Sequence, residues 1–330
     1  MMLRAALHEQ EIRRIIGAPG DGEHTFDGVS TLGAADDRSL YFINQDFTPE
    51  TLSILEQREG CIVVALRGAS AEVSLQNCLV LEADNPRTEL TKVLQFIRDE
   101  QRVAPLVTER KISATANISP LAVVEGAVEI GERVLIEPFC MIGPDVKIGS
   151  GSIISSGVRV YPRVVIGEKV VVGANSVIGH QGFGFVRDEA GNKIRMPHLG
   201  GVAIGSHVEI GALASVQSGT IIPTAIADHA KIDEYVHVGH NVRIARGASV
   251  TAGVIIAGHA VIDEEAWVGI NSSIREGRHV GAYSLVGMDS SIQQDLEARR
   301  IARSPRPAIE MRADSDDAAI GFAQRKMRKT

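Results

Sequence analysis

The 330-residue chain is poor in aromatic side chains, in surplus positive charge and in long apolar runs. Aromatic residues make up 4% of it, which excludes a core built mainly on packed rings. Its 41 acidic residues outnumber the 34 Lys and Arg, and the net charge of −7 argues against a nucleic-acid partner. No segment approaches the roughly 18 apolar residues of a membrane-spanning helix, and the first residues lack the apolar stretch of a signal peptide. We therefore expect a cytoplasmic protein with no integral membrane segment.

The three cysteines are also too scattered to form a metal-binding pattern. Cys61, Cys78 and Cys140 are each flanked by apolar residues. Such surroundings are typical of buried thiols, so we expect all three to be reduced and inert.

What the chain has instead is a ladder of Ile and Val residues spaced six apart. Two unbroken runs of twelve are separated by a shorter run that is out of phase by two. The positions are Ile112, Ile118, Val124, Ile130, Ile136, Ile142, Ile148, Ile154, Val160, Ile166, Val172 and Ile178; Ile204, Ile210, Val216 and Ile222; and Ile226, Ile232, Val238, Ile244, Val250, Ile256, Ile262, Val268, Ile274, Val280, Val286 and Ile292. A six-residue period fits neither an amphipathic helix nor an ordinary strand, but it is the period of a hexapeptide parallel β-helix. Three hexads complete one triangular coil, so β-branched side chains three hexads apart stack inside it.

The ladder resembles the left-handed β-helix of hexapeptide-repeat acyltransferases, and its handedness is inferred from that resemblance. The predicted fold is mainly β: a left-handed parallel β-helix with a small N-terminal α/β domain and a short C-terminal helix. We place the three parts at residues 1–108, 109–297 and 298–330.

Residues 1–108 lack the six-residue period and predict an α/β domain. The spacing of apolar residues over Leu3–Ile16 predicts a helix, and apolar runs predict strands at Leu40–Ile43, Cys61–Leu66 and Cys78–Glu82. Asn85 followed by Pro86 predicts a helix start, because Asn caps a helix and Pro suits its first position.

Residues 180–202 interrupt the ladder, and this interruption predicts a loop that projects from a corner of the coil. Phe183 and Phe185 in this loop are costly to leave in water, so we expect them to cover a cleft and bind substrate. We also expect the loop to reach a neighbouring subunit. The short step from Ile222 to Ile226 cancels the earlier change of phase.

The tail from Ala298 to Thr330 is basic, although the whole chain is acidic. It carries nine Lys or Arg against four Asp or Glu, and a helix is predicted from Ala308. A basic surface suits an acidic partner such as acyl carrier protein.

His240 is the strongest candidate for chemistry within the ladder. It follows closely after Val238 and is expected to project from a corner, where an imidazole can act as a general base. Gly258 lies one full coil of three hexads further on, so its unshielded N–H can stabilise an oxyanion beside the histidine. Asp233, just over one hexad before His240, is expected to orient the imidazole.

The chain resembles the UDP-3-O-acylglucosamine N-acyltransferases of lipid A and lipopolysaccharide assembly over nearly its whole length. The matching segments are FDGVSTLGAADDRSLYFI, ADNPRTELTKVL, Gly182-Phe183-Gly184-Phe185, Pro197-His198-Leu199-Gly200-Gly201-Val202, Ile204-Gly205, Val208-Glu209-Ile210-Gly211-Ala212, His240-Asn241-Val242 and Ala257-Gly258. The resemblance implies transfer of an acyl group from a thioester, acyl carrier protein or acyl-CoA, to the amine of a UDP-linked amino sugar. It implies no bound cofactor or metal, a homotrimer with sites between subunits, and nucleotide-sugar recognition by the N-terminal domain.

The resemblance also assigns roles to residues. It makes His240 the general base, Gly258 the oxyanion donor and Asp233 the partner of the base. Asn241, His198 and His259 belong to or adjoin the same motifs and are expected to bind substrate.

Three positions depart from the family pattern. Gln217 stands where the family has an Asp, Gly277 where it has a second functional His, and Leu90 where an aromatic residue is expected. His279 is two positions away from the missing His. These departures leave the sugar, the nucleotide and the acyl length open.

Three other functions are compatible with the sequence. The segment from Val286 to Ile292, followed by Ser304-Pro305-Arg306-Pro307, resembles the end of acetyl-CoA-dependent sugar N- or O-acetyltransferases. His237, His240 and His259 offer imidazoles for zinc, as in the carbonic anhydrases that share this solenoid, although the ligand spacing of those enzymes is absent. The third alternative is a non-catalytic scaffold.

Overall fold

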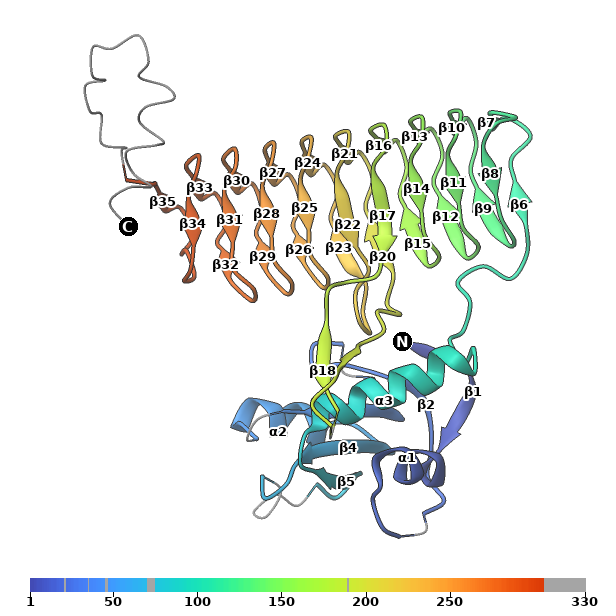
Figure 1. The fold of residues 1–330 in the computed structure, drawn as a ribbon, viewed down its shortest axis with the longest axis vertical. Coiled ribbons are helices and arrows are strands. Elements are labelled where there is room, and N and C mark those ends of the chain that lie inside the picture. The colour runs from blue at the N-terminus through green and yellow to red at the C-terminus, as the bar shows by residue number, and fades with distance from the viewer. Residues whose placement is uncertain (21, 35, 45–46, 70–74, 189, 306–330) are drawn as a thin grey trace, which may run out of the picture.

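The computed structural model describes residues 1–305 except residues 21, 35, 45–46, 70–74 and 189. A small α/β unit lies beneath the middle coils of a long parallel β-helix (Figure 1). None of the helices in these ranges is both long enough and apolar enough to cross a membrane. The C-terminal helix predicted from Ala308 lies outside the described residues.

The α/β unit is built on one five-stranded sheet in the order β1-β2-β3-β4-β5. Its strands are β1 (Met2–His8), β2 (Thr25–Val29), β3 (Ser39–Ile43), β4 (Cys61–Leu66) and β5 (Cys78–Ala83), and its helices are α1 (Glu9–Ile16), α2 (Pro49–Glu56) and α3 (Pro86–Asp99). The β1–β2 pair is antiparallel and the other pairs are parallel. The three strands predicted from apolar runs are therefore confirmed as β3, β4 and β5.

Helix α3 starts where its sequence predicts. The side-chain oxygen of Asn85 accepts a hydrogen bond from Thr88 N at 3.1 Å, and Pro86 occupies the first turn. Val93, Leu94 and Ile97 are fully buried on the face that meets the sheet.

The helix predicted over Leu3–Ile16 is wrong in its first half. Residues 2–8 form β1, and the helix α1 begins only at Glu9. The pairing of β1 with β2 shifts register between Met2 and Leu7. Leu3 and Leu7 are both buried, and a spacing of four residues places two side chains on one face of a strand as well as on one face of a helix.

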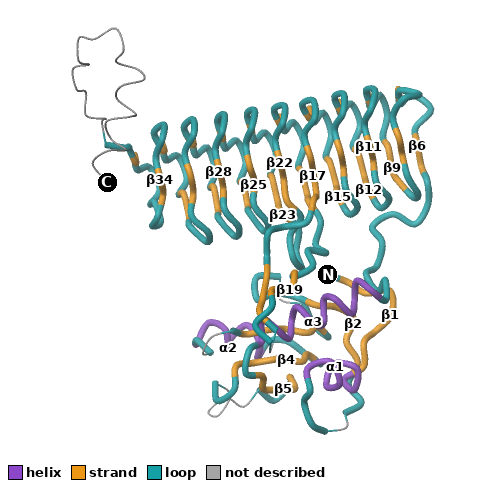
Figure 2. Tube along the Cα trace, viewed as in Figure 1, coloured by secondary structure: helices purple, strands orange, loops and turns teal. Residues whose placement is uncertain are grey.

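The β-helix has three faces, and each face is a parallel β-sheet to which every coil contributes one short strand (Figure 2). Face 1 comprises β6 (Lys111–Ile112), β9 (Val128–Ile130), β12 (Val146–Ile148), β15 (Val164–Ile166), β20 (Val202–Ile204), β23 (Thr224–Ile226), β26 (Arg243–Ile244), β29 (Val261–Ile262) and β32 (His279–Val280). Face 2 comprises β7 (Asn117–Ile118), β10 (Leu135–Ile136), β13 (Ile153–Ile154), β16 (Val171–Val172), β21 (Glu209–Ile210), β24 (Lys231–Ile232), β27 (Ser249–Val250), β30 (Trp267–Val268), β33 (Leu285–Val286) and β35 (Ile301–Ala302). Face 3 comprises β8 (Val123–Val124), β11 (Met141–Ile142), β14 (Arg159–Val160), β17 (Val177–His180), β22 (Ser215–Gln217), β25 (His237–Val238), β28 (Ile255–Ile256), β31 (Ser273–Ile274) and β34 (Ser291–Ile292).

The predicted left-handed parallel β-helix is confirmed. Ladder residues three hexads apart are register partners, as Ile136 is with Ile154, so three hexads make one coil. The ladder residues form one continuous core, and most of those in the middle coils are completely buried. Cys140 is buried in this core and Cys61 in the sheet, both as free thiols, while Cys78 is half-buried and also free.

Two insertions interrupt the coils at the same edge, between face 3 and face 1. Val172 pairs with Ile210, and Ile210 in turn pairs with Ile232. Both steps are longer than the three hexads of a regular coil: the first contains the loop 180–202, and the second contains a shorter insertion around Ile222. Ile222 packs toward the α/β unit, so its assignment to the ladder was wrong.

Candidate active site

The residues proposed for chemistry line up along the edge between face 3 and face 1, which we call the site edge. His240, Gly258 and Glu276 follow one another at intervals of one coil and occupy the same corner position. Asn241 and His259 fill the next corner position and have left-handed backbones, with φ of 59° and 60°. This conformation suits Asn better than His, so the backbone at His259 is held at a cost of about 1–2 kcal/mol.

Asn241 fixes the orientation of the His240 imidazole. Its side-chain oxygen accepts hydrogen bonds from Thr220 N at 3.1 Å and Thr220 Oγ1 at 2.8 Å, while its amide nitrogen donates to Ile222 O at 3.2 Å. The oxygen is therefore an acceptor, and it lies 3.3 Å from His240 Nδ1. This contact makes Nδ1 the protonated nitrogen of the neutral ring, and it leaves the Nε2 lone pair available to take a proton.

Gly258 lies directly against the other side of the His240 ring. A Cβ at this position would come within 2.7 Å of the ring atoms Cε1 and Nε2, far inside normal contact. The N–H of Gly258 makes no hydrogen bond to any residue that the structure describes. A free N–H beside a free Nε2 is the pairing that acyl transfer requires.

Asp233 does not contact His240 within one chain, contrary to our expectation. The separation of the two residues is one hexad plus one position, so Asp233 falls on the next edge, between face 2 and face 3. Its carboxylate accepts hydrogen bonds from Glu234 N at 2.8 Å and Ala252 N at 3.1 Å. In this chain, Asn241 occupies the orienting position that we assigned to Asp233.

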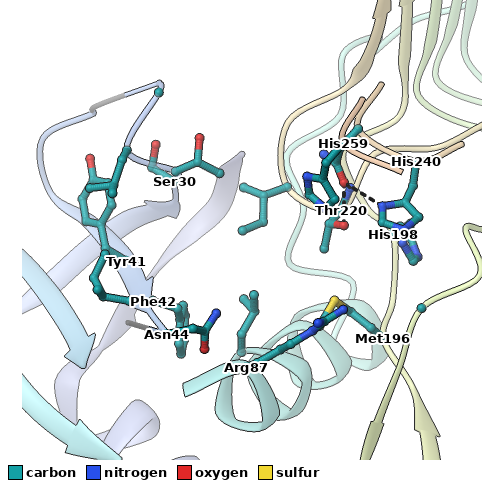
Figure 3. A pocket seen from close by; sticks show the side chains of 18 of the residues that line it. Ser30, Tyr41, Phe42, Asn44, Arg87, Met196, His198, Thr220, His240 and His259 are labelled. Atoms are coloured by element: carbon teal, nitrogen blue, oxygen red, sulfur yellow. Dashed lines mark hydrogen bonds between the residues drawn. The ribbon is translucent and has the colours of Figure 1, made fainter. Parts of the chain in front are cut away.

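The site edge faces the α/β unit across a cavity of about 500 Å³ (Figure 3). The β-helix lines one side with His240, Asn241, His259 and Glu276. The opposite wall comes from the α/β unit. It comprises Ser30, Thr31, Leu32 and Gly33 after the end of β2, Tyr41, Phe42 and Ile43 of β3 with the following Asn44, and Arg87 and Leu90 of α3. Thr220 and Ile221 of the second insertion close the cavity between them.

The loop 180–202 packs on the α/β unit of its own chain, and its reach to a neighbouring subunit stays a prediction. Strands β18 (Phe185–Arg187) and β19 (Lys193–Arg195) form an antiparallel hairpin that descends beside α3 (Figure 1). Val186 and Met196 are buried in the core of that unit, and Gln95 Nε2 on α3 donates to Arg195 O at 3.2 Å.

Of the expected loop residues, His198 lies at the cavity and the two phenylalanines lie outside its lining. His198 lines the cavity together with Gly184 and Met196. Phe183 is 78% exposed and contacts Phe185 edge to face, with 5.1 Å between ring centroids. The Arg195 guanidinium covers the Phe185 ring at 4.6 Å. A role for both rings in covering the cleft stays a prediction.

His198 is a buried, neutral ring next to His240. It is 2% exposed, its ring centroid lies 4.8 Å from that of His240, and its ring nitrogens lack hydrogen-bond partners among the described residues. Burial, reinforced by the His240 charge, lowers the pKa of His198 to about 4. Partial loss of hydration next to the protein lowers the pKa of His259, with the His240 charge as a further cause, and it also lowers the pKa of His237. A neutral His198 adds no positive charge beside the His240 ring.

The buried His198 should make the protein less stable in mild acid. The unfolded chain takes up this proton near pH 6.5, whereas the folded protein takes it up only near pH 4. The free energy of unfolding should therefore fall by about 3 kcal/mol from this residue as the pH drops through that window. Urea unfolding of His198→Leu should show a correspondingly flatter pH dependence, because leucine takes up no proton. Any loss of packing caused by the substitution lowers the free energy of unfolding by the same amount at every pH. His207→Asn, an exposed control with φ of 60°, should keep the parental slope; equal slopes in all three proteins would contradict the assignment.

Glu276 is the site residue that sequence reasoning missed. The signal was available, because Glu276 is two whole coils after His240. The family's second histidine instead directs attention to Gly277, which has open space around it, and to His279. His279 lies on face 1, where its Nε2 is 2.6 Å from Asp263 Oδ2, outside the cavity lining. Among the other departures, Gln217 accepts a hydrogen bond from His240 N at 3.2 Å, and Leu90 lines the cavity.

Comparison with known proteins connects this architecture to bacterial acyltransferases. The family described as bacterial transferase hexapeptide (six repeats) matches residues 127–162 and 145–180. A UDP-3-O-acylglucosamine N-acyltransferase from Leptothrix cholodnii is 33% identical over 251 residues, 73% of this chain and 71% of that protein. Its counterpart from Coxiella burnetii is 31% identical over 248 residues, 71% and 69% of the two chains. A local match to UDP-3-O-acylglucosamine N-acyltransferase 2 of Legionella pneumophila reaches 47% identity but spans 77 residues, 22% of that protein.

Solved structures agree with the fold. The UDP-N-acetylglucosamine acyltransferase of Francisella novicida superposes with a TM-score of 0.53 at 26% identity, covering 57% of this chain and 66% of that one. The enzyme of the same name from Campylobacter jejuni gives 0.52 at 24% identity, covering 64% and 83%, and this likeness concerns the fold alone.

Proposed function

Because this chain belongs to the UDP-3-O-acylglucosamine N-acyltransferase family, we propose that it transfers an acyl group from a thioester to the amine of a UDP-linked amino sugar. The observation that carries the proposal is the arrangement of His240, with Nδ1 held by Asn241 and Nε2 beside the unpaired N–H of Gly258. We propose a cytoplasmic location for this reaction.

The proposed reaction begins with the acceptor amine in its neutral form, after its ammonium has released one proton to water. The amine nitrogen attacks the thioester carbonyl carbon while His240 Nε2 takes a second proton from that nitrogen. The carbonyl oxygen becomes an oxyanion, which the N–H of Gly258 stabilises. The C–S bond then breaks, the amide is formed, and the protonated imidazole passes its proton to the departing thiolate. No metal or cofactor is needed for these steps to balance.

The charges around the cavity suit a molecule with a cationic and an anionic end. Glu276 places a carboxylate on the site edge beside His240, where a sugar ammonium would meet it. Arg87 lies on the opposite wall at the start of α3, and its guanidinium suits a diphosphate. In this orientation the nucleotide base lies among Tyr41, Phe42 and Asn44 of the α/β unit.

A homotrimer is part of the proposal. Leu213 and Tyr235 are 48% and 60% exposed on the edge between face 2 and face 3, and exposed Phe183 lies on the site edge. Contact between these two edges of neighbouring chains would cover all three side chains. Asp233 lies on the first of these edges, so its carboxylate would meet His240 of the next chain.

The proposed donor is acyl carrier protein, and the basic tail supports it. Arg299 stacks on Tyr283 at 4.9 Å and Arg300 pairs with Glu297 at 3.2 Å, which anchors the start of the tail to the last coil. Removing residues 308–330 should raise KM for acyl-carrier donors severalfold and weaken its salt dependence, because the cluster of Arg325, Lys326, Arg328 and Lys329 is lost. KM for acyl-CoA should change little. Equal kinetics with both donors before and after truncation would favour the acetyl-CoA-dependent alternative.

The test of the proposed function is product identification. Mass spectrometry should detect an N-acylated product when the protein is given a panel of UDP- and dTDP-linked amino sugars with acyl-carrier or acyl-CoA thioesters. A product acylated at a hydroxyl group, or no turnover of any thioester, would overturn it in favour of an O-acetyltransferase or a scaffold.

A further inference from the structure

Three side chains on the site edge converge as metal ligands do. His240, His259 and Glu276 each offer one donor atom, and the three donor atoms lie within 4.8 Å of one another. The His240 and His259 rings meet edge to face, with 5.0 Å between centroids. His259 and Glu276 make no side-chain hydrogen bond or ion pair with any described residue, so their donor atoms are free.

The stacking of the coils explains this convergence. The Glu276 corner lies two coils beyond that of His240, and the His259 corner lies on the coil between them. The intervening Gly258 has no side chain to separate the two histidines from Glu276. The rigid repeat therefore holds the Cα atoms of all three ligands at fixed spacing.

The donor set has a definite metal preference. Two imidazole nitrogens and one carboxylate oxygen, with a fourth position open, are a ligand set of protein-bound zinc. Zinc–nitrogen bonds of about 2.0–2.1 Å require tetrahedral donors roughly 3.4 Å apart. The side chains of His259 and Glu276 are exposed and can close the present spacing by rotation. The fourth position faces the cavity of about 500 Å³.

We propose that the site edge binds one divalent transition-metal ion of the zinc type through His240, His259 and Glu276, and that this ion inhibits the protein by occupying the base. Metal binding is inferred from the three ligands alone. Inhibition rests on the proposed function, in which His240 acts as the base. A metal-bound imidazole nitrogen has no lone pair to accept the proton of the acceptor amine.

Binding is tested on the full chain, first freed of metal with a chelator that is then removed. Titration with Co²⁺ should develop the visible absorption of a tetrahedral site at one ion per chain, and Zn²⁺ should displace the Co²⁺. Glu276→Gln keeps the shape of the side chain but removes its charge, and His259→Asn keeps a residue that tolerates the left-handed backbone. Each variant should weaken metal affinity more than about tenfold, as expected for loss of a direct ligand.

His229→Asn provides the matched control. His229 and His207 stack face to face at 4.9 Å on another edge, so they are the most plausible competing surface site. This variant should bind the metal like the parent. Undiminished binding in both Glu276→Gln and His259→Asn, loss of binding in His229→Asn, or no binding by the parent would each overturn the site.

Activity separates the two halves of the inference. Zn²⁺ should inhibit the parent competitively with the amino sugar, and EDTA should restore full turnover. A parent protein that binds the ion yet turns over unchanged would overturn the inhibition while leaving the site intact. A protein without turnover in the absence of metal would instead count against the proposed function, while the Co²⁺ spectrum still reports the site.

Discussion

His240→Ala should lower turnover by about 10²- to 10⁴-fold, the range over which a positioned general base contributes. The loss should appear mainly in kcat, because the ring acts on the proton during the chemical step rather than on the bulk of the substrate. In the variant, the Asn241 oxygen loses its contact with the imidazole but keeps its two hydrogen bonds from Thr220, so the corner should stay folded. Product formation is measured by mass spectrometry, and light scattering checks that the assembly matches that of the parent.

His237→Asn is the control for this experiment. His237 lies on face 3 of the same coil, shortly before His240, and is outside the lining of the cavity. Its variant should keep parental turnover. If His240→Ala stays within a few fold of the parent, or if His237→Asn loses as much activity, the proton acceptor has been misassigned.

Gly258→Ala should cost about 10²- to 10³-fold in kcat, comparable to the loss of an oxyanion donor. The added Cβ would lie 2.7 Å from His240 Cε1 and Nε2, so the imidazole must turn away from Asn241 or the corner must move. Either movement separates the base from the N–H that is proposed to hold the oxyanion. The double variant with His240→Ala should be no worse than His240→Ala alone, because both changes then disable the same unit.

Gly151→Asn tests whether any glycine substitution at a corner of the β-helix is harmful. Gly151 lies on the edge between face 1 and face 2, with φ of 71°, and the nearest atom to an added Cβ is Lys169 Cγ at an ordinary contact distance of 3.5 Å. Asn tolerates this backbone, so turnover and melting temperature should stay near those of the parent. Additive losses in the Gly258→Ala and His240→Ala double variant would show that the two residues act separately.

The β-helix could be predicted in detail because its rule is local and repeated. Every ladder residue sees the same surroundings, so a six-residue period determines coil length, strand position and the inward side chains together. The same arithmetic locates Gly258 against His240. It also locates Glu276, although the family pattern drew attention to Gly277 and His279 instead.

The features that could not be predicted depend on contacts between segments without a repeat. Nothing local distinguishes Leu3 and Leu7 in a strand from the same spacing in a helix, because residues four apart share a face in both. The docking of hairpin β18–β19 on α3 depends on the shape of the α/β unit, which the ladder does not encode. The position of Asp233 within one chain could not be predicted for a different reason: Asp233 is close to His240 in sequence, yet the step between them crosses from one edge of the β-helix to the next.

The position of the site along the stack has a mechanical consequence. A solenoid behaves as a one-dimensional array in which each coil is supported only by its two neighbours, so thermal fraying starts at the ends and moves inward. The corner of His240 has several complete coils on its N-terminal side, from β6 onwards, whereas one complete coil remains beyond Glu276, formed by β32, β33 and β34. Fraying that starts at the N-terminal end must therefore pass many coils before it reaches the three corners, whereas opening of the last coil removes one of the two neighbours that hold Glu276 in place.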